Sequence, residues 1–487
     1  MQSLPKVKFH LELILVIDPC GGAGNNLNHV TIETLPDNTL LEIFDFYRMD
    51  AAAADQSGGL PWMWHRLAHV CQRWRYLVYT SPRCLDLQIL CKSGAPIEPI
   101  LCTWPTLPLV LRFQGDARSE FLPDNIMIAL RYPDRVCDIN LTLMSSIIGS
   151  ISELLQVPFL ALKRIEMSSK GAEEQPVLGD FLGGSAPLLE QINLQGIAVP
   201  FPAIRRLLLS TSHLNTLQLF KIPNTCYFSP EDLVTCLSAL VHLKDLDVGF
   251  HSPASRPNPS MARPPPPHCA TLLSLVTLFF LGASEYLEEF LARIDCPVLT
   301  VLGIVYFKKL IFKIPRLLQF ISRVDGLNSP SEVVVNPDAT DPTICLLQSG
   351  PDRRWRCYFL IPWSQLDLQL SFSTQILRQL SPLLSSVHVL CIAGPSSLTG
   401  NEDMDPTQWL ELFQLFPQTS TILIDDQELV PDIVRALVSE DIMATGILPG
   451  LTSLHLKGYR KSKLTIEAAE RWVSTRKLAG RNILLSG

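Results

Sequence analysis

The chain has 487 residues, of which 47% are hydrophobic and only 18% are charged, and its formal net charge is −7. A chain of this length can hold more than one folding unit. The acidic balance and the lack of a long run of Lys and Arg argue against a nucleic-acid surface or a polybasic membrane patch. No apolar run reaches the roughly 18 to 20 residues that cross a bilayer. We therefore expect a protein that binds neither nucleic acid nor membrane.

The 13 cysteines are scattered along the chain. None forms a Cys-x-x-Cys pair and no His pair has zinc spacing, so no metal site is expected. Several, such as Cys71 and Cys236, lie on predicted apolar faces, where a free thiol packs as a small hydrophobe. This usage indicates a reducing compartment, the cytoplasm or the nucleus. The apolar run Leu11–Ile17 is short and lacks a signal peptidase site, so secretion is not expected.

Residues 1–30 form an N-terminal extension that contains the glycine run Gly21–Gly24. A dinucleotide or phosphate site needs a helix directly after the glycines and a surrounding α/β domain. Here Asn25–Asn28 follow instead, and a third fingerprint glycine and a P-loop lysine are missing. The glycines therefore indicate a flexible loop, and no cofactor is expected.

Residues 31–90 predict a small helical module. Pro36 suits the first turn of a helix, and Asp37 places a negative charge at its N-terminus. A first apolar stripe at helical spacing comprises Leu40, Ile43, Phe44 and Tyr47. A second stripe, ended by Ser81–Pro82, comprises Leu67, Val70, Cys71, Trp74, Leu77 and Val78. Two or three short helices cannot fill a core alone, so we expect the module to dock on a partner.

These residues resemble an F-box. That family opens with Leu-Pro, continues with a Leu-Leu-x-Ile-Phe helix and ends with Val-Cys-x-x-Trp-Arg, and all three parts occur here in order. The stretches Cys71–Leu87 and Trp104–Leu109 also resemble the extended F-box of basidiomycete fungi. The chain departs from the family at Asp50–Gly59, a longer connection between the helices that would weaken or reshape part of the docking face.

The resemblance implies docking on a Skp-type adaptor, which bridges to a cullin-RING ubiquitin ligase. By resemblance, the candidate contact residues are Leu35, Pro36, Leu40, Leu41, Ile43, Phe44, Val70 and Trp74. For Trp74 and Leu77 the sequence leaves two roles open, adaptor contact or internal core.

Residues 91–130 form a connecting segment with a predicted strand at Leu107–Phe113, and from residue 131 the chain is repetitive. An apolar-x-x-apolar-x-apolar pattern, the strand signature of leucine-rich repeats, recurs there. It begins at Val136, Leu162, Leu189, Leu214, Leu243, Leu275, Leu299, Val387, Thr419 and Leu451. The gap between residues 305 and 386 has room for about two degenerate repeats. Its candidate strands are Ser331–Asn336 and Gln365–Phe372.

The predicted fold class is α/β. The helical module is followed, over residues 131–487, by an irregular leucine-rich-repeat solenoid with parallel strands on its concave side and helices on its convex side. Expected helices are Pro230–Leu243, capped by Ser229, then Asp405–Phe416, Pro431–Ser439 and a closing helix at Thr465–Lys477 that covers the last edge. The Pro-rich segment 252–268 predicts a mobile loop that adds nothing to the core.

No motif carries chemistry. The acidic groups Asp425–Asp426 and Glu402–Asp405 lack the remainder of a metal loop, and the histidines form no triad. The pattern therefore predicts a non-catalytic protein, without catalytic, cofactor or metal residues, that recruits a substrate protein to a Skp-cullin-F-box ligase. A scaffold that binds the adaptor outside ubiquitin transfer is the alternative. The positions expected to face solvent on the strands and to bind the substrate are Gln191, Asn193, Gln218 and Asp247.

Overall fold

The structure is a computed structural model. It describes residues 34–54, 67–80 except 69, 88–92, 96–103, 106–115, 121–171, 177–255, 269–307, 313–336, 343–348, 355–360, 366–393, 406–426, 429–438, 447–457 and 463–486 except 479 and 481. The chain divides into two compact units, Met1–Leu87 and Gln88–Gly487. The predicted N-terminal extension, most of the Pro-rich segment and the acidic group 402–405 lie outside the described residues.

The first unit contains helices α1 (Asp37–Ala54) and α3 (Gln72–Thr80). Helix α1 starts directly after Pro36, as its first-turn chemistry predicts. It then continues through Ala51–Ala54, so the prediction that the connection begins at Asp50 is wrong. Alanine has the highest helix propensity, and the four alanines extend the helix by one turn. Helix α3 ends one residue before Ser81–Pro82, as predicted, because a residue before proline disfavours the helical conformation.

The interior of this unit comes from one face of each helix. Leu40 and Phe44 of α1 and Trp74, Leu77 and Val78 of α3 are all buried. The ring centroids of Phe44 and Trp74 lie 4.7 Å apart at an interplanar angle of 57°. These contacts follow from the helical spacing of the apolar residues, which puts each set on a single face.

A polar contact that the sequence did not predict joins the two helix starts. The Arg73 guanidinium donates to the backbone oxygen of Leu35 at 2.5 Å and to Oδ1 of Asp37 at 2.5 and 3.1 Å. The same side chain thus binds the residue before Pro36 and the first residue of α1. It holds the entry of α1 against the start of α3.

We expect Arg73→Met to loosen the first turn of α1. The side chains of Arg73 and Asp37 are 36% and 57% exposed, so the loss in unfolding free energy should be only about 1 kcal/mol. Hydrogen exchange of the α1 start, measured in the full chain, should become several-fold faster. Arg378→Met breaks an exposed ion pair with Glu411 in the second unit, where both side chains are 57% exposed, and should leave α1 unchanged. Equal exchange in both variants would contradict the role of Arg73.

Among the described residues, the second unit forms a sheet of 16 strands. In spatial order the strands are β1 (Ile89–Cys91), β2 (Leu109–Gln114), β3 (Val136–Met144), β4 (Arg164–Lys170), β5 (Gln191–Gln195), β6 (Thr216–Ile222), β7 (Asp245–Phe250), β9 (Thr277–Gly282), β11 (Val301–Tyr306), β14 (Trp355–Leu360), β13 (Thr343–Leu347), β12 (Glu332–Asn336), β15 (Val389–Ile392), β16 (Thr421–Ile424), β17 (Ser453–Leu456) and β18 (Leu484–Ser486). Strands β8 (Ala270–Thr271) and β10 (Ile294–Asp295) form a separate parallel pair.

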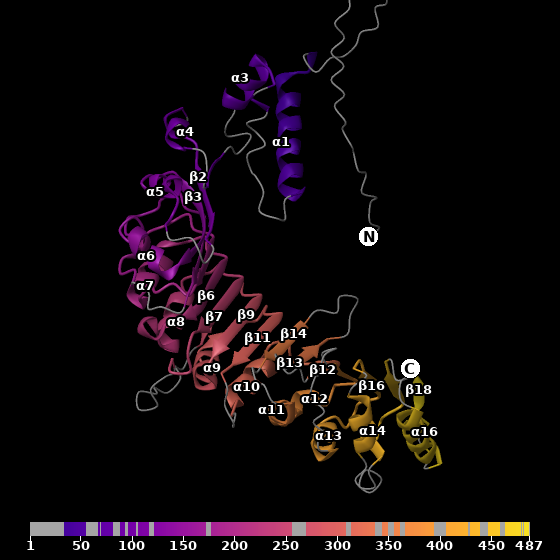
Figure 1. Ribbon diagram of the computed structural model, residues 1–487. Coiled ribbons are helices and arrows are strands. Elements are labelled where there is room, and N and C mark those ends of the chain that lie inside the picture. Colours follow the sequence, from indigo (N-terminus) through magenta and orange to yellow (C-terminus); the bar gives the residue numbers. More distant parts are fainter. Residues whose placement is uncertain are drawn as a thin grey trace, which may run out of the picture. The chain divides into compact units, whose positions relative to one another are not determined.

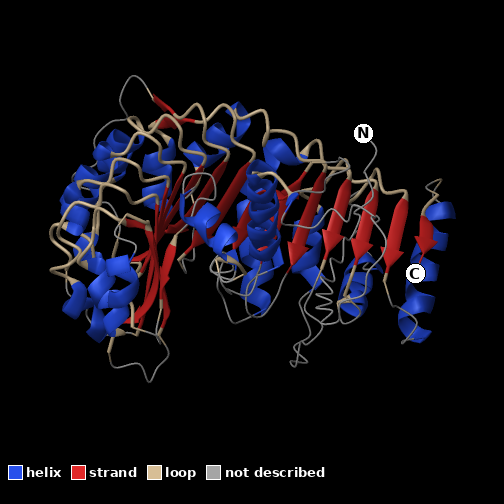
Figure 2. Cartoon of the chain, turned by 90° about the horizontal axis from the view of Figure 1, so that it is seen from above, coloured by secondary structure: helices blue, strands red, loops and turns tan. Residues whose placement is uncertain are grey.

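Helices alternate with these strands along the chain. They are α4 (Glu98–Thr103), α5 (Asp124–Leu130), α6 (Ser145–Ile151), α7 (Phe201–Ser210), α8 (Pro230–Leu237), α9 (Ser284–Leu291), α10 (Pro315–Arg323), α11 (Leu366–Gln379), α12 (Ser381–Leu384), α13 (Pro406–Phe413), α14 (Val430–Val438) and α16 (Lys463–Leu478). The helices of the second unit line one face of the sheet (Figures 1 and 2). No helix among the described residues is both long and apolar enough to span a membrane.

A strand forms at every predicted repeat position. It begins two residues after the first apolar residue of the pattern in each repeat except the first, where β3 starts at Val136 itself. That first residue closes a tight turn. The backbone N–H of Leu189, for example, donates to the oxygen of Ala186, and that of Leu243 donates to Leu240. The second and third apolar residues, such as Ile192 and Leu194, are buried. Because side chains alternate along a strand, both point to the helix-covered face, and the core lies between helices and sheet.

The region between residues 305 and 386 differs from the prediction. Strand β12 is present at Glu332–Asn336, but β13 pairs antiparallel with both β12 and β14, so the strands are not all parallel. The expected strand Gln365–Phe372 is wrong, because these residues belong to α11. The local alternation of Leu366, Leu368 and Leu370 favours a strand. The buried residues Leu370, Thr374 and Leu377 instead have helical spacing, and this pattern extends over a longer segment and decides the structure.

The other predicted helices are present as α8, α13, α14 and α16, although α8 ends at Leu237, six residues before the predicted end at Leu243. Ser229 caps α8 as expected, since its Oγ accepts from the backbone N–H of Asp232 at 3.1 Å. The prediction that a closing helix covers the last strand edge is wrong. Strand β18 follows α16 and pairs in parallel with β17, so it extends the sheet by one further strand.

Candidate interaction surfaces

The candidate contact residues of the first unit divide by exposure. Ile43 and Val70 are 40% and 59% exposed, Pro36 is exposed, and Leu35 and Leu41 are half-buried. Leu40, Phe44 and Trp74 are buried. Of the two roles left open for Trp74, the structure therefore places it in the interior. The candidate contacts Leu40 and Phe44 are interior residues too, because they lie on the face of α1 that packs toward α3.

Two exposed aromatic side chains of this unit were missed from the sequence. Phe46 on α1 is 75% exposed and Tyr76 on α3 is 66% exposed. Each lies two residues beyond a buried aromatic, Phe44 and Trp74, and so falls on the opposite side of its helix. The sequence signal that could have identified them is an aromatic residue that falls outside the apolar stripe of a short helix. Together with Ile43 and Val70, these side chains give the unit an apolar exterior that its own interior does not use.

A second surface is the sheet face opposite the helices, here called the open face. Strand pairing aligns one residue per strand across it. From β2 to β12 this row reads Arg112, Asn140, Glu166, Asn193, Gln218, Asp247, Phe279, Gly303, Tyr358, Cys345 and Val334. The row is polar up to β7 and apolar or aromatic beyond it. The open face therefore has two chemically distinct halves.

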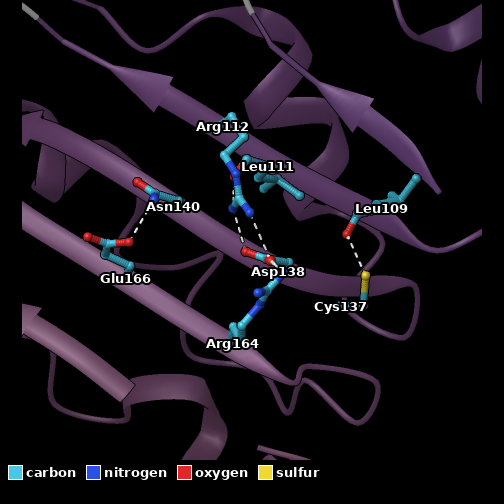
Figure 3. A network of polar contacts seen from close by, with 8 residues as sticks. All are labelled: Leu109, Leu111, Arg112, Cys137, Asp138, Asn140, Arg164 and Glu166. Carbon is cyan, nitrogen blue, oxygen red and sulfur yellow. Dashed lines mark hydrogen bonds and ion pairs between the residues drawn. The ribbon is translucent and has the colours of Figure 1, made fainter. Parts of the chain in front are cut away.

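In the polar half, Asp138 lies between two arginines (Figure 3). Arg112 forms a bidentate contact with the carboxylate, with one nitrogen 2.9 Å from Oδ2, and Arg164 lies 2.5 Å from the same oxygen. The Asp138 side chain is only 6% exposed. Asn140 donates to Glu166 at 2.7 Å on the neighbouring strand. These contacts line an open depression of about 210 Å³ whose floor is made by strands β2 to β6.

The expected partner-binding positions all lie on the open face, but their exposure differs. Gln191 is exposed, and Asn193 and Gln218 are half-buried. Asp247 is only 9% exposed and accepts from Nε2 of Gln218 at 2.5 Å. Burial raises the pKa of Asp247, and the nearby Asp245 carboxylate raises this pKa further. The hydrogen bond from Gln218 acts in the opposite direction and lowers the pKa. The charge of Asp247 is therefore held in a partly dehydrated position, where a cation would stabilise it.

Three aromatic rings follow one another across the boundary between the two halves, from Phe220 on β6 to Phe279 on β9 and Tyr358 on β14. The centroids of Phe220 and Phe279 are 5.6 Å apart, and those of Phe279 and Tyr358 are 6.2 Å apart. All three side chains are half-buried. Burial raises the pKa of Tyr358, and the negative charge of Asp247 raises it further, so the acidic and aromatic groups are electrostatically close.

Reactive groups are not brought together on either surface. No group of three or more His, Cys, Asp or Glu residues able to hold a metal ion occurs in the described part of the chain. The cysteines that the structure describes are free, and burial raises the pKa of Cys91 and Cys345 to about 12, which keeps these thiols protonated. Asp425 of the acidic pair is bound to Lys457 at 2.5 Å.

Of the histidines noted in the sequence, His455 joins the last two strands. Its ring nitrogens contact Oγ of Ser453 at 2.7 Å and Oγ of Ser486 at 2.5 Å. The second contact crosses from β17 to β18, so it helps to hold the terminal strand. A Ser–His pair that acts as a nucleophile needs a third group to orient the imidazole, whereas here both ring nitrogens are used by serines.

No model of a known protein family and no curated protein matches this sequence. The function is therefore inferred from the two surfaces described above. The exposed apolar side chains of the first unit, such as Ile43 and Val70, and a broad open sheet face are both suited to binding macromolecules.

Proposed function

We propose that this protein is the substrate-recruiting adaptor subunit of a Skp-cullin-F-box ubiquitin ligase, acting in the cytoplasm or nucleus. The first unit is an F-box that docks on a Skp-type adaptor and through it on a cullin. The second unit is an irregular leucine-rich-repeat solenoid whose open face holds a substrate protein. Its mechanism is proximity, because holding a substrate lysine near the charged ubiquitin-conjugating enzyme raises the effective concentration of the reactants.

The observation that carries this proposal is that some apolar residues of the F-box-like motif are buried in the first unit while others are exposed on its surface. The F-box-like motif supplies the residues that join the helices, Phe44 and Trp74, and also leaves Ile43 and Val70 exposed. A unit of this size has little interior of its own, so a partner that covers its apolar exterior would stabilise it. Among the candidate contacts, Leu35, Pro36, Leu41, Ile43 and Val70 remain accessible to such a partner, and Phe46 joins them.

The recurrence of one structural unit supports the proposal for the second part. Each predicted repeat contributes a buried turn residue, a strand and a connection to the next strand, often through a helix. Stacked units of this kind leave one sheet face uncovered along their length, and repeat proteins use such faces to bind other proteins. The half-buried and exposed polar side chains of β5 and β6 suit a protein ligand better than an apolar small molecule.

We expect the double substitution Ile43→Asp, Val70→Asp to abolish detectable binding of a purified Skp-type adaptor. Burying two carboxylates in an apolar interface should cost more than about 3 kcal/mol, or over a hundredfold in Kd. Binding is measured by calorimetry with the full chain. The matched control is Val241→Asp, Val298→Asp, two valines of the second unit that are 63% and 45% exposed. The control should bind as the unmodified chain does.

Two results would overturn the proposal: an unmodified chain with no affinity for the adaptor, or unchanged binding by the Ile43 and Val70 variant. A complex that contains the adaptor but excludes the cullin would favour the scaffold alternative. Adding purified cullin to the preformed complex and measuring its mass distinguishes the two functions.

A further inference from the structure

The boundary between the polar and aromatic halves of the open face has a chemistry of its own. There Asp247 on β7 is aligned with Phe279 on β9, Phe279 with Gly303 on β11, and Gly303 with Tyr358 on β14. A carboxylate thus stands beside aromatic rings on one continuous surface. We call Phe220, Phe279 and Tyr358 the aromatic strip, and Asp245 and Asp247 the acid pair.

Two glycines make room for the aromatic strip. A Cβ added at Gly303 would overlap the ring of Tyr358 and approach Cδ2 of Phe279 to 2.8 Å. A Cβ added at Gly249 would approach Cδ1 of Phe220 to 2.9 Å. The rings therefore lie over bare backbone, low on the sheet, and each ring remains partly exposed. The three rings of the strip contact one another in sequence and form one continuous surface.

The acid pair gives this surface an unbalanced charge. Within the described part of the chain, neither Asp245 nor Asp247 forms an ion pair, and their bonded neighbours are the neutral Thr216 and Gln218. The arginines of the nearby strands, Arg112 and Arg164, are already joined to Asp138. The boundary therefore complements a positive charge.

We propose that the aromatic strip and the acid pair together bind an arginine side chain within an extended segment of the recruited protein. The alkyl stem and the planar guanidinium lie on the rings, and the charge meets the acid pair. Arginine suits both parts, because it stacks on aromatic faces and donates to carboxylates in one plane. This inference takes from the proposed function only that the ligand is a recruited protein.

The test uses the full chain and two fluorescent decapeptide pools, randomised at every position except the central one. That position is arginine in one pool and citrulline, its neutral isostere, in the other. The unmodified chain should bind the arginine pool about five- to tenfold more tightly. Asp247→Asn, which keeps an acceptor for Gln218, and Phe279→Leu, which keeps apolar volume, should each remove most of this difference. Glu166→Gln, in the polar half, should preserve it.

Asp245→Asn provides a second carboxylate variant in case Asp247→Asn fails to fold. Equal affinity for the two pools overturns the proposal, and so does an absence of binding to the arginine pool up to about 1 mM. A preference for arginine that persists in both the Phe279 and the carboxylate variants also overturns it, because the site would then lie elsewhere. No adaptor or ligase is present, so the outcome is independent of the F-box assignment.

Discussion

Phe44→Ala should unfold the first unit and leave the second unit intact. Phe44 is fully buried, and its ring packs at a tilt against that of Trp74, which joins α1 to α3. Truncating a buried phenylalanine costs about 3 to 5 kcal/mol, which is comparable to the whole stability that a single small hydrophobic core supplies. Hydrogen exchange of α1 and α3 should approach the unprotected rate, whereas strands β3 to β7 should keep their protection. Adaptor binding should weaken in parallel, because the folded unit would become a minor species.

Phe46→Ala is the matched control. It removes the same side chain from the same helix, but Phe46 is 75% exposed and contributes little to the interior. Exchange of α1 and α3 should remain within about twofold of the unmodified chain, since surface substitutions usually change stability by less than 0.5 kcal/mol. If Phe44→Ala retains the protection of α1 and α3, the Phe44–Trp74 contact does not hold the unit together.

Ending the chain after Phe307 should cause the remaining fragment to aggregate. This cut removes β14, which pairs with β11 from Leu302 to Val305, and so leaves a bare edge in the middle of the sheet. It also removes α10, whose first N–H groups, from Arg316 and Leu317, donate to the Glu288 carboxylate of α9 at 2.7 and 2.9 Å. An exposed long edge together with an uncovered apolar face promotes association between chains. Soluble yield and light scattering measure the effect.

A chain that ends at Gly480 serves as the control for this truncation. It loses β18, a strand of 3 residues with Leu484 and Ser486 exposed, while α16 remains in place. Little apolar surface is uncovered, so this shorter chain should stay monomeric and soluble. A monomeric fragment 1–307 with a cooperative thermal transition would show that the two parts of the sheet fold independently, contrary to the expectation.

The repeat strands and most of their helices could be predicted because their determinants are local. Apolar alternation places Ile192 and Leu194 on one face of a strand whatever surrounds it. The Ser229 cap acts within one helical turn, and Pro82 ends α3 through its immediate neighbour. The same alternation correctly placed Gln191, Asn193, Gln218 and Asp247 on the opposite face. It could not distinguish the exposed Gln191 from the buried Asp247, since burial depends on neighbouring strands.

Three features required the tertiary structure. The antiparallel strand β13 and the helix α11 arise where a short apolar run fits more than one element, and long-range packing decides between them. The burial of Phe44 and exposure of Phe46 depend on where α3 lies. The aromatic strip joins Phe279 to Tyr358 across Gly303, although β12 and β13 lie between Gly303 and Tyr358 in the chain. By itself the sequence determined which residues share a strand face. Only the pairing of distant strands decided which side chains meet, because strand register depends on hydrogen bonds between remote segments.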